Sequence, residues 1–277
     1  MSSKTLARMI RRGASLAVVA LLLLVVLFPV LWLVLMSVRT EAESFRMPPQ
    51  LFFTPTAKNY LDLMQSKFFR AFENSVVTST ATTVLSLLLG VPAAYALGRA
   101  HLRPERLLSL WVLATRMAPP IAFGIPFFLI YKHLDLIDTR LGLVLIYLSF
   151  NLSLVIWMMR AFFEGLPASL EEAAYIDGAG VVGAFLRVTL PLSAPGLATT
   201  AIFCFLLSWN DFFYSLILTR SEAVTAPVAI VNFMDYERWE YGKITAATSV
   251  IMLPVVAFSL AVRKYLIRGL TAGAVKG

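Results

Sequence analysis

Residues that could catalyse a reaction or bind a metal are scarce in this sequence. It has one cysteine, Cys204, and two histidines, which excludes an intrachain disulfide and a cysteine metal cluster. It contains no HExxH zinc motif, no G-x-S-x-G nucleophile elbow and no Walker phosphate-binding motif. We therefore expect no catalytic residues, no metal and no cofactor. If the chain belongs to an ATP-driven system, another chain must bind the ATP.

Charged residues are also few, at 14% of the chain, whereas hydrophobic residues make up 59% and the mean hydropathy is +0.78. This composition excludes an ordinary soluble domain, and apolar runs of about 20 residues recur along the chain. The formal charge of +8 does not indicate nucleic-acid binding, because the basic residues cluster at the ends of apolar runs. We predict an all-α membrane protein.

About six membrane-spanning helices are expected, over residues 14–38, 71–97, 107–131, 141–162, 196–218 and 244–266. The first run is too long for the apolar region of a signal peptide and lacks a cleavage site, so we interpret it as an anchor. Gly90, Ala94 and Gly98 recur at every fourth position and predict close helix packing. Asp138 and Thr139 are candidate caps for the fourth span. The third span contains four residues that would break a regular helix: Pro119, Pro120, Gly124 and Pro126.

The distribution of basic residues predicts the orientation. They are concentrated in the N-terminal segment, in residues 99–106 and in the C-terminal tail, beside short segments where the positive-inside rule has force. Both termini and the loop at residues 170–195 are therefore expected in the cytoplasm.

Residues 170–195 cannot lie in a bilayer, because four charges there would each cost several kcal/mol. The spacing of Ser169 and Glu172 predicts a capping box. A first short helix is expected to start at this capping box and to end at Gly178 and Gly180. A second helix over 181–188 is expected to end at Pro191. The first helix has a small apolar stripe, which suits docking into a groove on a partner. A solvated loop helix is the alternative.

Polar residues inside apolar runs are candidates for a translocation path. Arg116 lies in the third span, where it could face a cavity or form an ion pair, for example with Asp211. Asn151 lies in the fourth span. Trp209, Asn210 and Asp211 intrude into the fifth span and could bind hydroxylated rings; an interfacial tryptophan beside a helix-bending asparagine is the alternative.

The spacing of several motifs carries a family resemblance. Residues 172–174 (EAA), Gly178 and the V-x-L-P at 188–191 resemble the EAA loop of the membrane subunits of ABC importers. Asp177 and Ala179 are similar to the carbohydrate-uptake branch. The run at 209–212 (WNDF) and the tail at 269–277 follow in the order found in sugar importers. The likeness is greatest to the second, shorter permease subunit of maltose-type systems.

The resemblance implies a type I ABC importer permease fold, with residues 1–277 as a single transmembrane permease domain and a core at about 71–266. It implies a coupling loop at 163–195 and a tail at 267–277 that enters the ATPase interface. The ATPase-coupling residues would be Glu171, Glu172, Ala173, Ala174, Asp177 and Gly178. The tail residues would be Gly269, Gly273, Lys276 and Gly277.

The implied partners are a second homologous permease subunit, two ATP-binding ATPase subunits, and an extracytoplasmic sugar-binding protein toward which loop 219–243 would project. The implied location is the bacterial inner membrane. The substrate would be a di- or oligosaccharide or a polyol, since the chain lacks the long loop insertions of the maltose subunit.

Three alternatives stay open at this point. One alternative is an ABC permease for glycerol phosphate or another small solute. A cavity with several basic residues would suit such a solute, but only Arg116 is available. An ion-coupled secondary transporter would need intramembrane carboxylates, and Asp211 stands nearly alone. A structural membrane scaffold would need neither the tail nor the docking loop.

Overall fold

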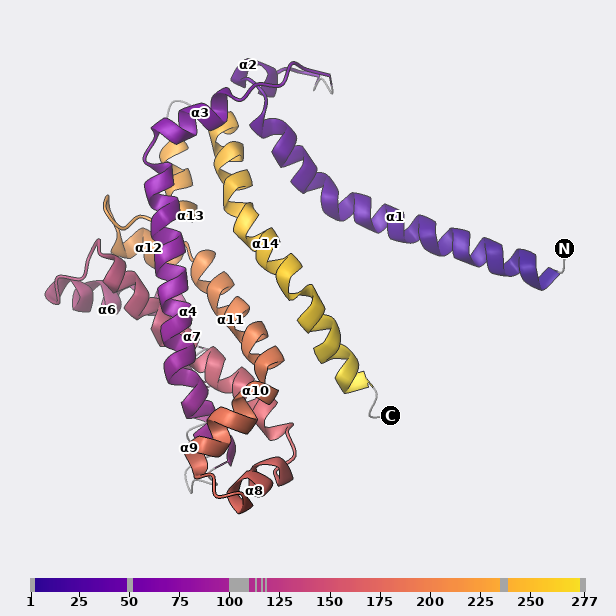
Figure 1. Cartoon of the computed structure of the whole chain (residues 1–277). Coiled ribbons are helices and arrows are strands. Elements are labelled where there is room, and N and C mark those ends of the chain that lie inside the picture. The colour runs from indigo at the N-terminus through magenta and orange to yellow at the C-terminus, as the bar shows by residue number, and fades with distance from the viewer. Residues whose placement is uncertain are drawn as a thin grey trace. The chain divides into compact units, whose positions relative to one another are not determined.

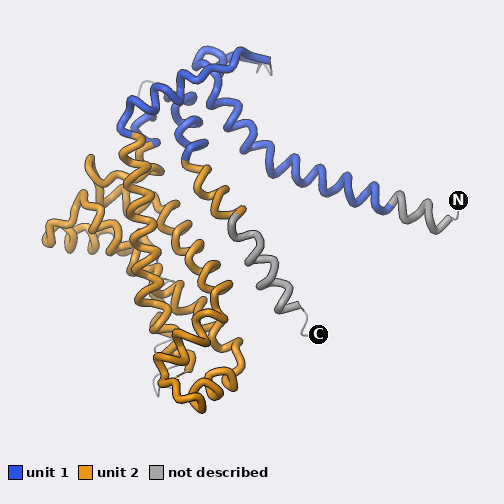
Figure 2. Tube along the Cα trace, in the orientation of Figure 1, with its two compact units in different colours: residues 1–67, 230–250 blue, residues 68–229, 251–277 orange. Residues whose placement is uncertain are grey.

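The computed structural model describes residues 3–48, 52–99, 110–112, 114, 115, 117, 119–234 and 239–274. Nearly all of these residues are helical, which confirms the expected all-α fold, and the β-type pairing among them is one isolated bridge between Met234 and Trp239. Helices follow from the long apolar runs, because a backbone in hydrocarbon must satisfy its hydrogen bonds within its own segment. The chain forms two compact units, residues 1–67 with 230–250 and residues 68–229 with 251–277 (Figure 2).

Unit 1 contains the N-terminal helix and a small set of short helices. They are α1 (Ser3–Ser37), α2 (Glu41–Ser44), α3 (Lys58–Gln65), the 3-10 helix η2 (Ile230–Phe233) and the first part of α14 (Tyr241–Ala274). Along residues 11–31 the apolar side chains of α1 are exposed all round, with Leu16 at 70% and Leu24 at 64%. Residues Arg11–Ser37 are long and apolar enough to cross a membrane. A helix of this kind is suited to lipid.

A single asparagine ties the parts of unit 1 together. The Asn59 amide donates hydrogen bonds to the backbone carbonyls of Ser37, at 2.8 Å, and Arg39, at 2.7 Å. Gly242 in α14 lies so close to this amide that a Cβ there would come within 2.5 Å of Asn59 Oδ1. The first turn of α14 therefore requires a glycine where it meets α3.

Unit 2 is built around three helices that lie side by side (Figure 1), α4 (Phe68–Arg99), α7 (Arg140–Glu164) and α11 (Ala194–Trp209). The predicted close packing is confirmed at Gly90, where a Cβ would approach Val155 Cγ1 to 2.7 Å. Ala94, one turn further, is fully buried. The remaining elements of the unit are α6 (Pro120–His133), α8 (Ser169–Ile176), α9 (Val181–Ala184), the π-helical turn η1 (Phe185–Thr189), α10 (Leu190–Leu192), α12 (Phe213–Leu218), α13 (Ala226–Ala229) and the rest of α14.

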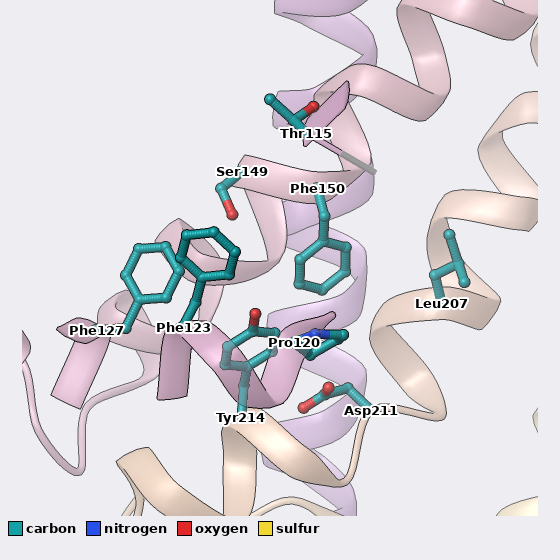
Figure 3. A pocket seen from close by; sticks show the side chains of 9 residues that line it. All are labelled: Thr115, Pro120, Phe123, Phe127, Ser149, Phe150, Leu207, Asp211 and Tyr214. Carbon is teal, nitrogen blue, oxygen red and sulfur yellow. The ribbon is translucent and has the colours of Figure 1, made fainter. Parts of the chain in front are cut away.

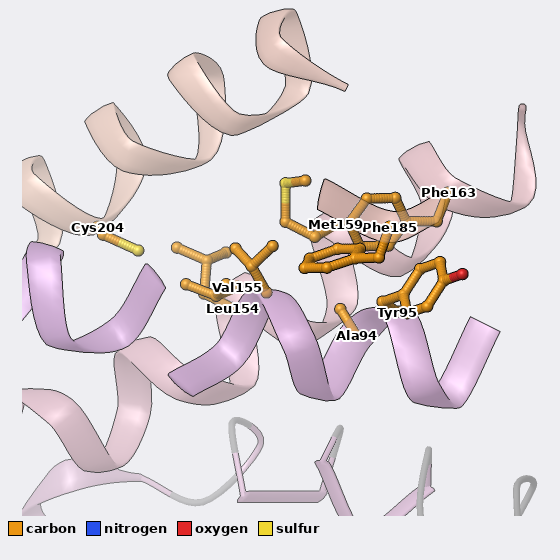
Figure 4. Packing of buried hydrophobic residues seen from close by; sticks show 9 residues of the cluster. Ala94, Tyr95, Leu154, Val155, Met159, Phe163, Phe185 and Cys204 are labelled. Carbon is orange, nitrogen blue, oxygen red and sulfur yellow. The ribbon is translucent and has the colours of Figure 1, made fainter. Parts of the chain in front are cut away.

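The core of unit 2 joins four of these elements (Figure 4). Tyr95 of α4, Phe163 of α7 and Phe185 of η1 pack ring against ring, with centroids 4.6 to 6.2 Å apart. The cluster consists of Val91, Ala94, Tyr95, Leu154, Val155, Met159, Phe163, Phe185 and Cys204. Cys204 is thus a small packing residue of α11.

The described residues contain four or five of the six expected membrane spans. Four described helices are long and apolar enough to cross a membrane, and a fifth span results if the bent pair Val181–Leu192 and Ala194–Trp209 is one span. The expected third span falls partly outside the described residues. Its described helix, α6, begins after Pro119, and Gly124 and Pro126 lie inside it, so Pro119 rather than these two marks the break. Six spans stays a prediction.

Two expected helix ends differ from the structure. The span expected over 196–218 is interrupted at Asn210 and Asp211, between α11 and α12. The helix expected to end at residue 266 instead continues to Ala274, through Gly269 and Gly273 of the expected tail. Each glycine costs about 1 kcal/mol relative to alanine within a helix, which does not suffice to end a long one. Lys276 and Gly277 lie outside the described residues.

Candidate functional site

The end of α8 is shaped by Gly178. This residue has φ +83°, and its N–H donates to the Tyr175 carbonyl at 3.0 Å, while the Ala179 N–H reaches the Ala174 carbonyl at 2.9 Å. These two bonds form a Schellman motif, which requires a left-handed residue after the helix. A Cβ at residue 178 would meet nothing within 4 Å. Glycine is needed here for its backbone conformation, and the space around it is open.

The predicted capping box at the start of α8 is wrong. The N-cap is Ala168, which makes no side-chain capping bond, and Ser169 is already helical. The helix begins one residue earlier than expected, so Glu171 rather than Glu172 occupies the third helical position. The carboxylate of Glu171 is turned toward other elements of the unit and does not cap the helix.

One face of α8 is open to solvent. Glu172, Ala173 and Asp177 are exposed, Ile176 is 87% exposed, and Ala174 is half-buried. Small residues flanked by carboxylates allow close approach of another backbone and offer charged contacts at the edge. Three of the residues predicted to couple to an ATPase, Glu172, Ala173 and Asp177, are therefore exposed, and so is Gly178.

Glu171, grouped with these residues by sequence, lies inside the protein and is only 6% exposed. Its Oε1 accepts hydrogen bonds from Thr189 Oγ1 at 2.8 Å and from Arg99 Nε at 3.1 Å. Its Oε2 accepts one from the Tyr95 hydroxyl at 3.0 Å. Arg99 also donates to the Leu166 carbonyl at 2.8 Å. The carboxylate thus joins α8 to the last turn of α4 and to η1.

The helix after α8 contains a wide turn. The run from Val181 continues through η1 and ends at Leu192, within one residue of the expected end at Pro191. A π-helical turn is rare, occurs mostly as a single wide turn inside an α-helix, and is frequently found at functional sites. The axis then bends by 77° into α11.

A cavity of about 450 Å³ lies within unit 2 where α11 gives way to α12 (Figure 3). Phe150 and Tyr214 stack with centroids 5.8 Å apart, and Phe127 meets Tyr214 edge to face at 6.1 Å. Asp211 and Ser149 add polar atoms. The described lining residues are Thr115, Pro120, Phe123, Phe127, Ser149, Phe150, Leu207, Asp211 and Tyr214. Aromatic faces with a few hydrogen-bonding groups are typical of a small-molecule site.

Asp211 is the one predicted path residue that lines this cavity among those the structure describes. Its Oδ2 accepts hydrogen bonds from the Tyr147 hydroxyl at 3.0 Å and from the Ser215 N–H at 3.1 Å. The second bond caps α12, so this carboxylate also stabilises the restart of the helix after the break. Arg116 lies outside the described residues.

The other predicted path residues have different surroundings. Trp209 is 1% exposed, stacks on Phe205 and donates its indole N–H to the Ile251 carbonyl at 3.3 Å. Asn210 is exposed and donates to the Leu206 carbonyl. Asn151 is buried and donates to Ser208 Oγ at 2.8 Å. The Trp209 and Asn151 bonds join α11 to α14 and α7, the Asn210 bond lies within the end of α11, and none of the three residues lines the cavity.

Sequence reasoning missed the aromatic wall of the cavity. Phe123 and Phe127 are spaced four residues apart on α6, a repeat that was visible in the sequence. Phe150 and Tyr214 carry no such signal, because they meet only when α7 and α12 pack. Tyr95, Arg99 and Thr189 were missed for the same reason, since they reach Glu171 from distant parts of the chain.

The loop after α12 is held by Asp138. Thr139 is the predicted cap of α7 and accepts from the Gly142 N–H at 3.0 Å, as expected. Asp138 instead accepts hydrogen bonds from the consecutive backbone N–H groups of residues 220–223, at 3.0 to 3.1 Å. Partial burial would raise the pKa of Asp138, but these four bonds outweigh it and lower the pKa to about 2.

Two neighbours in α4 complete this clamp. The Asn74 amide donates to the carbonyls of Glu222, at 2.8 Å, and Val224, at 2.9 Å. Ser75 Oγ accepts from the Ala226 N–H at 2.8 Å. Residues 220–226, the first part of the loop predicted to face a binding protein, are thus fixed to α4 and to the turn before α7.

Comparison with known proteins gives a consistent result. Residues 86–272, more than half of the chain, match the family described as binding-protein-dependent transport system inner membrane component. The trehalose transport system permease protein SugB of Mycobacterium tuberculosis is 40% identical over 257 residues, covering 91% of this chain and 93% of that protein. The trehalose/maltose transport system permease protein MalG of Thermococcus litoralis is 32% identical over 262 residues, covering 93% and 94%.

A solved structure shares the fold. A chain of a bacterial ABC transporter involved in the import of the acidic polysaccharide alginate superposes with a TM-score of 0.76 at 28% identity. The match covers 96% of this chain and 98% of that chain. The expected ABC importer permease fold is thereby confirmed.

Proposed function

The chain belongs to the binding-protein-dependent transport system inner membrane component family, and from this premise we propose that it is the permease subunit of an ATP-driven sugar importer. A second permease subunit, two ATPase subunits and an extracytoplasmic binding protein would complete the complex. The substrate would be a di- or oligosaccharide or a polyol, and both termini would be cytoplasmic. Alternating access would move the substrate across the inner membrane.

The observation that carries this proposal is the exposed face of α8. Glu172 and Ala173 stand free on a helix whose end is fixed by the Schellman motif at Gly178. A short, firmly capped helix with small side chains can enter a groove without losing much conformational freedom. This supports docking of an ATPase on residues 172–178, and ATP hydrolysis would occur on that partner.

The cavity supports a sugar substrate. Aromatic rings bind the apolar faces of sugar rings, and the free lone pairs of Asp211 and the Ser149 hydroxyl can bind hydroxyl groups. The relatives point the same way, since SugB and MalG are named as permeases for trehalose and for trehalose/maltose. Among the described lining residues the sole charge is the Asp211 carboxylate, which disfavours an anion such as glycerol phosphate.

The test is ATPase stimulation in the purified complex. The chain would be co-expressed with its partner permease, ATPase and binding protein, and ATP hydrolysis measured with trehalose, maltose, a polyol or glycerol phosphate. We expect a sugar or polyol to stimulate ATP hydrolysis by about tenfold, which is toward the lower end of the range typical of coupling between sites. Stimulation by glycerol phosphate alone, or failure of the ATPase to co-purify, would contradict the proposal.

The same assay examines the cavity. Asp211→Asn keeps an oxygen that can accept from Tyr147 and Ser215 but removes the charge, whereas Asp211→Ala removes both. If Asp211 contacts the sugar, both variants should raise the sugar concentration needed for half-maximal stimulation. If it only caps α12, Asp211→Asn should behave as the wild type.

A further inference from the structure

Glu171 makes the densest set of side-chain contacts at this end of unit 2. One buried carboxylate accepts from Tyr95 and Arg99 of α4 and from Thr189 of η1. The Arg99 and Glu171 side chains are 19% and 8% exposed, so water screens this ion pair poorly. Three elements, α8, η1 and the distant α4, are thus joined at one carboxylate.

Each partner of Glu171 is itself fixed. Tyr95 belongs to the core cluster, where its ring lies 4.6 Å from Phe185 and 5.7 Å from Phe163 (Figure 4). Thr189 is fully buried in the π-helical turn. Arg99 also binds the Leu166 carbonyl in the segment that enters α8. If α8 moved while α4 and η1 stayed in place, buried hydrogen bonds of Glu171 would therefore break.

Breaking such bonds is costly. A buried donor that loses its acceptor forfeits its hydration as well as the bond, and a buried ion pair that loses one partner leaves an uncompensated charge. The alternative is that the elements move together. The exposed neighbour Glu172 has no such contacts with α4 or η1 among the bonds of the described residues, so the two adjacent glutamates have different roles.

We propose that Glu171 is a positioning residue that makes α8, the last turn of α4 and η1 move as one body. Movement of a partner bound to the exposed face of α8 would then reach α4 directly, and α11 through η1 and the 77° bend. This transmission rests on the proposed ATPase partner. The mechanical joint itself does not, because it requires only the contacts within this chain.

The joint is tested by the distance between two spin labels on the full chain in lipid nanodiscs. Labels at Ile176 of α8 and Leu88 of α4 use exposed positions, at 87% and 64%, with the buried Cys204 replaced by alanine. Glu171→Gln removes the charge. Thr189→Val removes one hydroxyl while keeping the shape, and Thr189→Ser keeps the hydroxyl. Glu172→Gln, one residue away, is the matched control.

We expect a narrow distance distribution in the wild type, in Thr189→Ser and in Glu172→Gln. In Glu171→Gln and Thr189→Val its width should roughly double, because α8 gains further orientations relative to α4. If Glu171→Gln fails to fold, the comparison of Thr189→Val with Thr189→Ser still tests the joint. Unchanged widths in the folded variants would overturn the joint, whatever partner binds α8.

Transmission is tested in the reconstituted complex. At equal amounts of bound ATPase, Thr189→Val and Glu171→Gln should lower the sugar transported per ATP hydrolysed by about fivefold, and Thr189→Ser should restore it. Glu172→Gln should instead weaken ATPase co-purification. A broad distance distribution with unchanged transport per ATP would overturn transmission. Failure of the wild type to bind an ATPase would overturn the proposed function and leave the joint intact.

Discussion

Asp138 illustrates how one residue fixes a loop in this protein. It stands in a left-handed backbone conformation, with φ +58°, at the turn before α7. Four consecutive N–H groups of residues 220–223 point at its carboxylate. Hydrogen bonds from the backbone to an ionised group are about twice as strong as those between neutral groups. The charge on Asp138 thus orders the start of the loop predicted to face the binding protein.

The lowered pKa gives a pH dependence. An unfolded aspartate titrates near 3.8 and folded Asp138 near 2, so its contribution to stability is fully present above about pH 4 and is lost as the pH falls toward 2. Asp138→Asn, which also tolerates positive φ, should lower the free energy of unfolding at pH 6 by about 2 kcal/mol. The deficit relative to the wild type should shrink between pH 4 and pH 2.

Thermal unfolding of the full chain, followed by tryptophan fluorescence at several pH values, measures this deficit. Asp135→Asn is the matched control, because Asp135 lies in the same turn, also has positive φ, and makes none of the four contacts with residues 220–223. A deficit that stays constant down to pH 2 would show that the charge on Asp138 is irrelevant.

At the scale of elements, α8, the proposed docking helix, depends on its C-terminal cap. Gly178 and Gly180 both have open space around a notional Cβ, but only Gly178 has positive φ. Gly178→Ala should destabilise the end of α8 by about 1 kcal/mol, since a Cβ is strained in that conformation. Gly180→Ala should not. Bulk is not the cause, because both substitutions add the same methyl group.

Association with the ATPase provides the measurement. We expect Gly178→Ala to weaken binding of the purified ATPase by about fivefold and Gly180→Ala to leave it unchanged. Equal binding by both variants would mean that α8 docks without a fixed C-terminal end. Equal loss in both would indicate that the ATPase surface reaches residue 180 and excludes any added methyl group.

The elements of this fold differ in how well the sequence predicts them. The apolar runs locate α1, α4 and α7 well, because their length alone separates them from loops. The break at Asn210 and Asp211 is not predictable in this way. Asp211 at this break is bound by the Tyr147 hydroxyl from 64 positions away, a contact that no local pattern reveals.

In the predicted coupling loop, the sequence predicts some individual residues well and others not at all. The sequence identifies the exposed Glu172 and Ala173 by motif, but it cannot separate Glu171 from Glu172. Their surroundings differ because adjacent residues of a helix face different directions, so Glu171 points to α4 and η1 while Glu172 is exposed. The partners of Glu171 are 18 to 76 residues away, and no local pattern reveals them.

At the scale of the whole molecule, unit 2 contains both of the sites that the proposed function requires. The exposed face of α8 is the proposed docking surface, and the aromatic cavity beside Asp211 is the proposed sugar site. The core cluster contains residues of α4, α7, η1 and α11 and lies at the Glu171 end of the unit, where it packs these four elements together. A secondary transporter would have no use for the docking helix, and a scaffold would have no use for the cavity.

Uptake into proteoliposomes tests this account most directly. The complex is reconstituted with ATP inside, binding protein and labelled sugar are added outside, and internal sugar is measured over time. We predict accumulation above the external concentration that requires internal ATP and is unaffected by a protonophore or a sodium ionophore. Accumulation without ATP that collapses when the ion gradients are dissipated would contradict the account.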